Sequence, residues 1–257
     1  MTLQDKTVII TGGTHGIGEE TALLFASRGA RVLIIGRDEN KASRIIAQSQ
    51  GKIEFLKCDL SDREQVLKLC RTIEQKYDKV HVLINNASRN SRFNVLNLEL
   101  DEWDKMIELN MTSVFLLTKT VASKMIKSGI KGKIINVGAV QSFFPLESSF
   151  AYSTVKGAMR SMTKSMAVDL APYGILVTLV MPGPIYTKAE SNEPGIDLDS
   201  RAATLVGRMG RKSEVAELLE FLSSDRNTFM TGNEIIIDGG RTISRKPDPA
   251  EITRGDI

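Results

Sequence analysis

The stretch TGGTHGIG at residues 11–18 decides the fold of this chain. An apolar run, TVII at 7–10, precedes it, and a segment with a helical spacing of apolar residues follows at 18–28. A glycine-rich turn between a strand and a helix is typical of a βαβ unit, where backbone N–H groups at the helix N-terminus face a diphosphate. The stretch therefore predicts a dinucleotide-binding fold.

The glycines of this turn have separate expected roles. Gly12 permits the tight turn, Gly16 lets the backbone approach the pyrophosphate, and Gly18 lets the helix pack against the strand. The residues of the turn that we expect to contact the cofactor are Gly12, Thr14, His15, Gly16, Ile17 and Gly18.

The rest of the chain repeats the alternation of strand and helix. The apolar runs predict strands at 7–10, 31–35, 53–56, 80–84, 133–137, 175–180 and 234–237. The amphipathic segments predict helices at 18–28, 39–48, 63–77, 101–127, 152–170 and 213–222. This order predicts an α/β fold of the Rossmann type: a doubly wound, mainly parallel seven-stranded sheet with helices on both faces.

The 257 residues are expected to form a single dinucleotide-binding domain over 1–257, since no linker or repeat interrupts the pattern. The irregular stretch 184–208 is either a substrate lid or an ordinary surface connection. The segment 241–257 is a polar, proline-containing tail.

Charge and cysteine content argue against several classes of partner. The 34 basic and 31 acidic residues nearly balance, which predicts neither a nucleic-acid nor a membrane partner. The two cysteines, Cys58 and Cys70, lack the spacing of a metal or redox site, so we expect buried thiols and no metal. The polar start of the chain and the absence of a long apolar run predict a cytoplasmic protein.

The end of the second predicted strand bears on which dinucleotide is bound. An acidic side chain there accepts hydrogen bonds from a ribose diol and repels the 2′-phosphate of NADP. Arg37 offers a guanidinium suited to that phosphate, whereas Asp38, one residue later, suits a diol. Alternatively, Arg37 is solvated and Asp38 caps a helix. We predict NADP(H) rather than NAD(H).

Tyr152 and Lys156 are four residues apart in the helix predicted at 152–170, which places both side chains on one face. A neighbouring ammonium favours the phenolate, so we expect Lys156 to lower the pKa of Tyr152. Such a tyrosine exchanges the proton that accompanies hydride transfer to a carbonyl. The same spacing is common by chance, so this pair alone is weak support for catalysis.

The chain resembles the short-chain dehydrogenase/reductase family from Lys6 to Gly240. The motifs that carry the resemblance are TGGTHGIG at 11–18, CDL at 58–60, NNAS at 85–88, Asn110, YSTVK at 152–156, PGPIYT at 182–187 and DGG at 238–240. The block at 207–225 is similar to carbonyl reductases that include the 3-oxoacyl-carrier-protein reductases.

The resemblance implies roles for individual residues. Tyr152 corresponds to the catalytic acid/base, Lys156 to its partner that also binds the nicotinamide ribose, and Asn110 to the asparagine that holds a relay water. Further cofactor contacts are implied for Asp59, Leu60, Asn86, Ala87, Pro182, Gly183, Ile185 and Thr187.

The chain departs from the family pattern at two positions. The catalytic serine is expected thirteen residues before Tyr152, where this chain has Ala139, and loss of one such donor typically costs on the order of 10²–10³ in rate. Ser142 or other donors take over the role, or the serine was replaced by engineering, or the reductase chemistry is lost or altered. Ser88 stands where the family usually has glycine, and we expect it to crowd the cofactor channel slightly.

The predicted function is that of an NADP(H)-dependent oxidoreductase that interconverts a carbonyl and a secondary alcohol on a small or medium-sized metabolite. The alternatives are a nucleotide-binding scaffold or sensor and a non-redox enzyme on the same fold. The resemblance also implies a homo-oligomer, either a tetramer or a dimer.

Weaker candidates have structural explanations. His81 is expected to be structural and Trp103 to lie in the core or an interface. Arg89, Asn90, Arg92 and Phe93 follow the NNAS segment. They form either one wall of the substrate cleft, where the two arginines suit an anionic substrate, or a solvated loop.

Overall fold

The computed structural model describes residues 3–89, 92–187 and 204–245. Most of the stretch 184–208 and of the tail 241–257 therefore lies outside the described residues, as does Asn90. The strands are β1 Thr7–Thr11, β2 Arg31–Gly36, β3 Ile53–Lys57, β4 Val82–Asn85, β5 Lys133–Val137, β6 Leu176–Pro182, β7 Ile185–Tyr186, β8 Gly210–Arg211 and β9 Glu234–Ile237. The α-helices are α1 Gly16–Ser27, α2 Glu39–Gln48, α3 Arg63–Lys76, α4 Leu100–Ile107, α5 Ser113–Lys127, α6 Phe150–Leu170 and α7 Lys212–Ser223.

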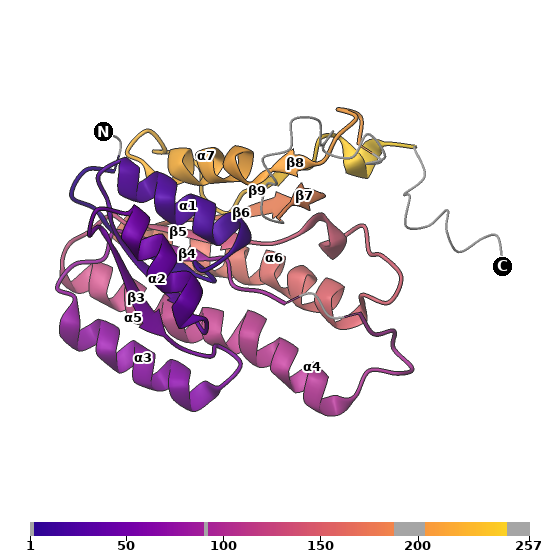
Figure 1. The fold of residues 1–257 in the computed structure, drawn as a ribbon, viewed down its shortest axis with the longest axis horizontal. Coiled ribbons are helices and arrows are strands. Elements are labelled where there is room, and N and C mark those ends of the chain that lie inside the picture. Colours follow the sequence, from indigo (N-terminus) through magenta and orange to yellow (C-terminus); the bar gives the residue numbers. More distant parts are fainter. Residues whose placement is uncertain (1–2, 90–91, 188–203, 246–257) are drawn as a thin grey trace.

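Seven strands form one parallel sheet in the order β3-β2-β1-β4-β5-β6-β9. The chain runs from β1 outward to β3, then returns to the other side of β1 and continues to β9 (Figure 1). The strand order thus reverses between β1 and β4, and crevices for ligands form at such switch points, outside the carboxyl ends of the strands. The predicted doubly wound, seven-stranded fold is confirmed.

Alternating strand residues divide the core into two layers. On one face of the sheet, Val8 and Ile10 of β1 pack with α1, α2 and α7, whose buried residues include Phe25 and Leu219. On the other face, Ile9 packs with α3, α5 and α6. Because both faces are covered, β1, β2 and β4 contain continuous apolar runs rather than an alternation of apolar and polar residues.

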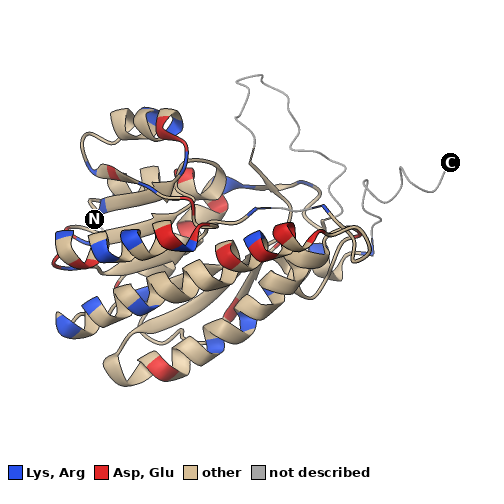
Figure 2. Cartoon of the chain, turned by 90° about the horizontal axis from the view of Figure 1, so that it is seen from below, with Lys and Arg blue, Asp and Glu red and all other residues tan. Residues whose placement is uncertain are grey.

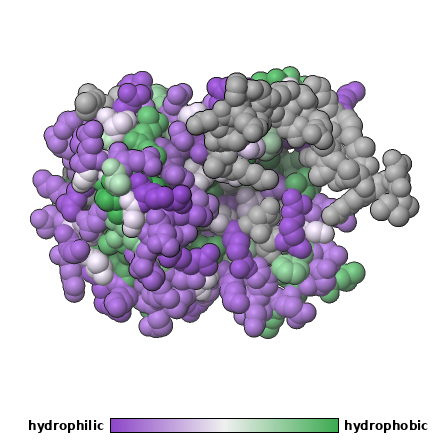
Figure 3. Space-filling model, viewed as in Figure 1, coloured by the Kyte–Doolittle hydropathy of each residue, from purple (hydrophilic) through white to green (hydrophobic). Residues whose placement is uncertain are grey.

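The outer surface carries charges of both signs. Lysine, arginine, aspartate and glutamate are interspersed along the helices in Figure 2. The face seen in Figure 3 is mainly hydrophilic, with hydrophobic residues scattered among the polar ones. No helix among the described residues is long and apolar enough to cross a membrane.

One predicted helix is interrupted. The segment 101–127 contains α4 and α5 joined by a π-helical turn at Glu108–Thr112. The side chain of Asn110 donates to the carbonyl of Met106 at 3.0 Å, the group that the backbone N–H of residue 110 binds in a regular α-helix. A side chain that competes for a ladder carbonyl accounts for the wider turn at this point.

The short strands β7 and β8 were not predicted, because two-residue strands leave no period-2 pattern. The other element boundaries differ from the predicted ones by at most a few residues, for example Phe150 rather than Tyr152 at the start of α6.

We expect Gly18→Ala to destabilise the protein by about 1–3 kcal/mol, the usual cost of overpacking. A Cβ atom at Gly18 would lie 2.3 Å from the carbonyl oxygen of Gly12 and 2.6 Å from the amide nitrogen of Asn86. The matched control is Gly157→Ala within α6, where a Cβ atom would lie 3.8 Å from the carbonyl oxygen of Ser142, an ordinary van der Waals distance. Because alanine favours helix, the control is expected to stabilise the protein by up to about 1 kcal/mol. Denaturant unfolding measures both, and equal free energies of unfolding would contradict the prediction.

Candidate active site

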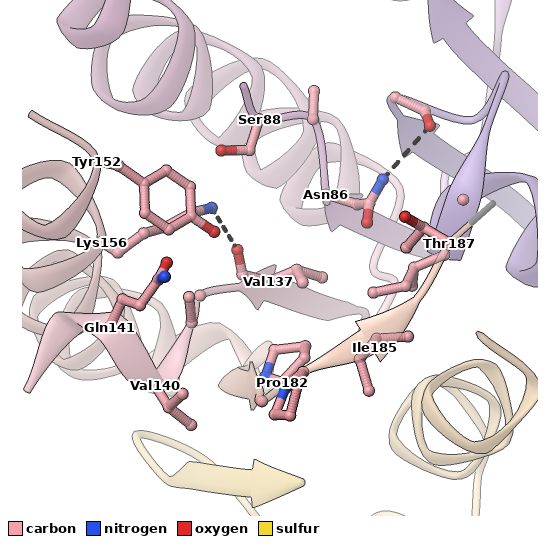
Figure 4. A pocket seen from close by; sticks show the side chains of 18 of the residues that line it. Asn86, Ser88, Val137, Val140, Gln141, Tyr152, Lys156, Pro182, Ile185 and Thr187 are labelled. Carbon is pink, nitrogen blue, oxygen red and sulfur yellow. Dashed lines mark hydrogen bonds between the residues drawn. The ribbon is translucent and has the colours of Figure 1, made fainter. Parts of the chain in front are cut away.

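A cavity of about 450 Å³ opens at the carboxyl ends of β1, β4 and β5. In Figure 4, Asn86 and Thr187 lie on one side of this cavity, and Tyr152 and Lys156, near the start of α6, lie on the other. The predicted site residues that line it are Gly12, His15, Gly16, Ile17, Asn86, Ala87, Tyr152, Lys156, Pro182, Gly183, Ile185 and Thr187. The tertiary structure therefore brings the two predicted groups, cofactor-binding and catalytic, into one cavity.

The glycine turn is tied to the end of β4 by hydrogen bonds. The hydroxyl oxygen of Thr11 accepts from the backbone N–H groups of Asn86 and Ala87, both at 2.9 Å. The side-chain amide of Asn86 donates to the carbonyl of Thr11 at 2.9 Å. A Cβ atom at Gly12 would lie 2.9 Å from the Cα atom of Ala87, so glycine is required where these two segments meet. Gly12 also has a φ of +66°, a left-handed conformation that favours glycine.

The N-terminus of α1 is suited to an anion. Gly16 and Ile17, in its first turn, line the cavity, and the preceding His15 makes no side-chain capping hydrogen bond to that turn. Burial, and then the charge of Lys41, lower the pKa of His15 below its ordinary value, so the imidazole is neutral at neutral pH. The helix dipole and the uncapped N–H groups together favour a phosphate here. The glycine turn thus fits a dinucleotide.

A second cavity of about 430 Å³ continues from the first and shares Gly12, His15, Ala87 and Ser88 with it. Four further predicted contacts line this second cavity: Thr14, Arg37, Asp59 and Leu60. Two adjoining cavities on either side of the glycine turn match a ligand with two halves joined by a diphosphate.

Arg37 and Asp38 are used differently. The guanidinium of Arg37 lies 3.3 Å from the carboxylate of Asp59, and the Arg37 side chain is 68% exposed. Asp38 caps α2 by accepting from the backbone N–H of Lys41 at 3.0 Å, which also holds the pKa of Asp38 below its ordinary value. The helix-capping interpretation of Asp38 is confirmed.

Lys156 is fully buried, with its side-chain ammonium donating to the carbonyl of Val137 at 2.8 Å. Its Nζ atom lies 5.7 Å from the centre of the Tyr152 ring (Figure 4). Burial lowers the pKa of Lys156 to about 7 and raises the pKa of Tyr152 to about 12. The predicted spacing on one helix face is therefore observed, but the expected lowering of the tyrosine pKa is not, because desolvation disfavours both charged forms.

Asn110 does not line either cavity. It is fully buried, and its side-chain oxygen accepts from the hydroxyl of Ser88 at 2.8 Å while its amide donates to Met106. Ser88, which departs from the family pattern, lines both cavities and anchors this asparagine rather than only narrowing the channel.

Three residues lie where the family's catalytic serine is expected or close to it in sequence: Ala139, Gln141 and Ser142. Ala139 lines the first cavity with its methyl group. The hydroxyl of Ser142 lies 3.7 Å from the sulfur of Met181, and Ser142 is not among the described residues that line the cavity. Gln141 does line it. The structure thus does not bring Ser142 to Tyr152. The 3₁₀ turn at Val140–Ser142 directs the Ser142 side chain toward Met181 rather than into the cavity.

Several lining residues were not predicted from the sequence. They include Gln141, Phe144, Leu146 and Arg241 in the first cavity and Lys41 and Lys105 in the second. The position of Gln141 two residues after Ala139, and of Arg241 directly after the DGG motif, were available signals. Phe144, Leu146 and Lys105 belong to no motif, so only the tertiary structure shows their position.

The weaker candidates have structural roles. The Nδ1 atom of His81 accepts from the backbone N–H of Thr7 at 3.0 Å, and the Trp103 ring stacks on Phe150. Arg89 forms an ion pair with Glu102, which weakens the case for an anionic substrate.

Neither cysteine forms a disulfide, and both thiols are buried. Burial raises the pKa of Cys58 to about 12 and also raises the pKa of Cys70, which favours the protonated thiol at both positions. Within the described ranges no cluster suited to a metal ion is present.

The depressed pKa of Lys156 predicts a stability that depends on pH. Between the folded-state pKa of about 7 and the ordinary value of 10.5, the unfolded chain binds the proton and the folded chain does not. Stability therefore rises with pH in that window, by at most about 1.4 kcal/mol per pH unit. We expect Lys156→Met to remove this rise, and Lys164→Met, on the exposed face of α6, to keep it. Denaturant unfolding between pH 7 and pH 9.0, where the thiols and phenols of the unfolded chain stay mostly protonated, makes the comparison. Equal slopes for the two variants would refute it.

Comparison with known proteins agrees with this geometry. The model of the short chain dehydrogenase family matches residues 6–194. A cyclopentanol dehydrogenase of Comamonas testosteroni is 35% identical over 93% of this chain and 98% of its own length. A 3-oxoacyl-[acyl-carrier-protein] reductase of Thermotoga maritima is 32% identical over 95% and 100%. The crystal structure of acetoin dehydrogenase from Salmonella typhimurium superimposes with a TM-score of 0.88 and 30% identity, covering 94% of this chain and 97% of that one.

Relatives of similar identity differ in cofactor. An alcohol dehydrogenase of Lentilactobacillus kefiri, 33% identical over 93% of this chain and 98% of its own, is NADP-dependent. A glycerol dehydrogenase of Listeria innocua, 33% identical over 94% and 95%, is NAD-dependent. The shared sequence and fold leave one conclusion: the chain belongs to the short-chain dehydrogenase/reductase family and is an oxidoreductase.

Proposed function

We propose that this oxidoreductase uses NADP(H) to interconvert a carbonyl and a secondary alcohol on a small or medium-sized neutral metabolite. The observation that carries the proposal is that Tyr152 and Lys156 face the same cavity as the glycine turn. The cavity also has apolar walls from Val140, Phe144 and Leu146, which suit an uncharged substrate.

Tyr152 is the proposed acid/base. In reduction, a nicotinamide dinucleotide, when bound, supplies the hydride to the carbonyl carbon. The electrons of the C=O double bond move to oxygen, and the Tyr152 hydroxyl gives that oxygen its proton. Because burial raises the pKa of Tyr152 to about 12, the hydroxyl is protonated at neutral pH, as reduction requires.

Lys156 and Asn110 are proposed to support this step. Lys156 is held rigid by the carbonyl of Val137, and its ammonium form favours the tyrosinate that remains after proton transfer. The side chain of Asn110 already bonds to Ser88 and Met106, so we assign a relay water to its backbone carbonyl.

The preference for NADP(H) rests on charge in the second cavity. Arg37, Lys41, Arg89 and Lys105 line it against the two carboxylates of Asp38 and Asp59, and this excess of basic side chains favours a phosphate on the adenosine ribose. Asp38 is occupied as the cap of α2, so its carboxylate is less available to a ribose diol.

We also propose that the chain assembles into a homo-oligomer. β9 is an edge strand, and Ile236 on it is exposed. Leu100 on α4, Phe115 on α5 and Val168 on α6 are exposed apolar side chains on the long helices. The cytoplasmic location predicted from the sequence stays a prediction, with which the free thiols agree.

Tyr152→Phe is expected to lower kcat for ketone reduction on the order of 10²–10⁴, since it removes the general acid. The assay follows NADPH oxidation with acetoin and with cyclopentanone, the ketone of cyclopentanol. Tyr173→Phe, an exposed tyrosine just after α6, is the matched control and keeps its rate. Undiminished turnover in Tyr152→Phe would overturn the proposed function.

Arg37→Ala is expected to weaken NADPH binding about tenfold, at the low end for a hydrogen bond to a charged group because the side chain is exposed. NADH binding stays the same, since that cofactor lacks the 2′-phosphate. Arg44→Ala, an exposed arginine on α2 that lines neither cavity, is the control. Fluorescence titration of the unaltered chain and the two variants with both cofactors gives six dissociation constants. A loss that is equal for NADPH and NADH would argue against the assigned specificity.

A further inference from the structure

We infer that Gln141 donates the hydrogen bond to the substrate oxygen that Ala139 cannot supply. The inference rests on the proposed function and names a further catalytic residue of the same site.

At position 139 the cavity wall lacks a hydrogen-bond donor on its side chain. Ala139 has extended backbone and is 6% exposed, and its side chain reaches the cavity without a polar atom. Stabilisation of the oxygen on which negative charge develops requires a donor in this wall or near it. The cavity contains few side chains able to supply one.

Most polar side chains at the catalytic end of the cavity are already bonded. The Ser88 hydroxyl donates to Asn110, and the Lys156 ammonium donates to Val137. Arg241 lies with its guanidinium 4.8 Å from the centre of the Phe144 ring. Gln141 differs, because its side-chain amide has no hydrogen-bond partner within 3–89, 92–187 and 204–245. An amide that lines a cavity and lacks a protein partner is available to a ligand.

The backbone around Gln141 is held in place. The 3₁₀ turn is closed by the N–H of Ser142 donating to the carbonyl of Ala139 and by the N–H of Phe143 donating to the carbonyl of Val140, both at 3.1 Å. The two residues after it face other directions: Ser142 contacts Met181, and the Phe143 ring lies 5.3 Å from the guanidinium carbon of Arg160. Successive side chains of a 3₁₀ helix point about 120° apart, which leaves the cavity side for Gln141.

Figure 4 shows the result. The Gln141 amide points into the cavity on the side where the Tyr152 hydroxyl and Lys156 also project. A carbonyl oxygen placed between them can accept the N–H of Gln141 and the O–H of Tyr152 through its two lone pairs.

In the proposed reduction, Tyr152 transfers a proton, whereas Gln141 only donates a hydrogen bond. As hydride adds to the carbonyl carbon, the C=O electron pair moves onto oxygen, which takes the Tyr152 proton. The Gln141 amide keeps its own proton throughout and stabilises the developing charge by hydrogen bonding. Because an amide does not ionise, its contribution is independent of pH.

The test is a set of four proteins: the unaltered chain, Gln141→Ala, Ala139→Ser and the double variant. With cyclopentanone and acetoin as probes, we expect Gln141→Ala to lower kcat on the order of 10²-fold, the typical effect of removing such a donor. Ala139→Ser alone gains little, because a donor is already present, whereas in the double variant it recovers most of the loss. NADPH affinity and the unfolding transition stay unchanged in all four.

Gln141→Glu adds a readout that a structural role would not move. A carboxylate repels the developing charge, so this variant is expected to be slower than Gln141→Ala at neutral pH. It recovers relative to Gln141→Ala when acidified, because a protonated carboxyl group can donate.

The outcomes separate the two proposals. If Tyr152→Phe abolishes turnover but Gln141→Ala does not, the proposed function stands and the role of Gln141 is refuted. A large gain from Ala139→Ser in the otherwise unaltered chain also refutes it, because the site then lacked a donor. If the unaltered chain reduces neither ketone, or if Tyr152→Phe is neutral, the proposed function is overturned and this inference with it.

Discussion

The site depends on the attachment of the glycine turn to the end of β4 through Thr11. One hydroxyl oxygen accepts two backbone N–H groups, of Asn86 and Ala87, at the point where the strand order reverses. The contact brings backbone so close that a Cβ atom at Gly12 has no room. The same attachment joins the two cavities, because Gly12 and Ala87 line both of them. A cofactor that spans the turn therefore meets a surface prepared by packing rather than by the cofactor itself.

Burial governs the electrostatics at the catalytic end. Lys156 is enclosed and bonded to Val137, and desolvation shifts its pKa and that of Tyr152 toward their neutral forms. A neutral tyrosine is the form that reduction needs, whereas oxidation needs its conjugate base.

The two departures from the family pattern lie in the same cavity, and each has a structural counterpart. Ser88 adds a hydroxyl that holds Asn110 at the π-helical turn. Ala139 removes a hydroxyl, and Gln141 supplies the amide nearest to it in sequence that reaches the cavity. The relatives of this chain include NADP- and NAD-dependent enzymes, so local polar groups rather than the fold distinguish one family member from another.

The sequence by itself determined the fold, the glycine turn and the pairing of Tyr152 with Lys156. These features follow from short-range patterns: apolar runs, glycine spacing and a separation of four residues on one helix. Only the tertiary structure decided that Gln141 and Lys41 line the cavities and that Ser88 bonds to Asn110, and it also set the pKa values of Tyr152 and Lys156. Burial and hydrogen bonding sum contributions from segments far apart in the chain, and no local pattern records which segments meet.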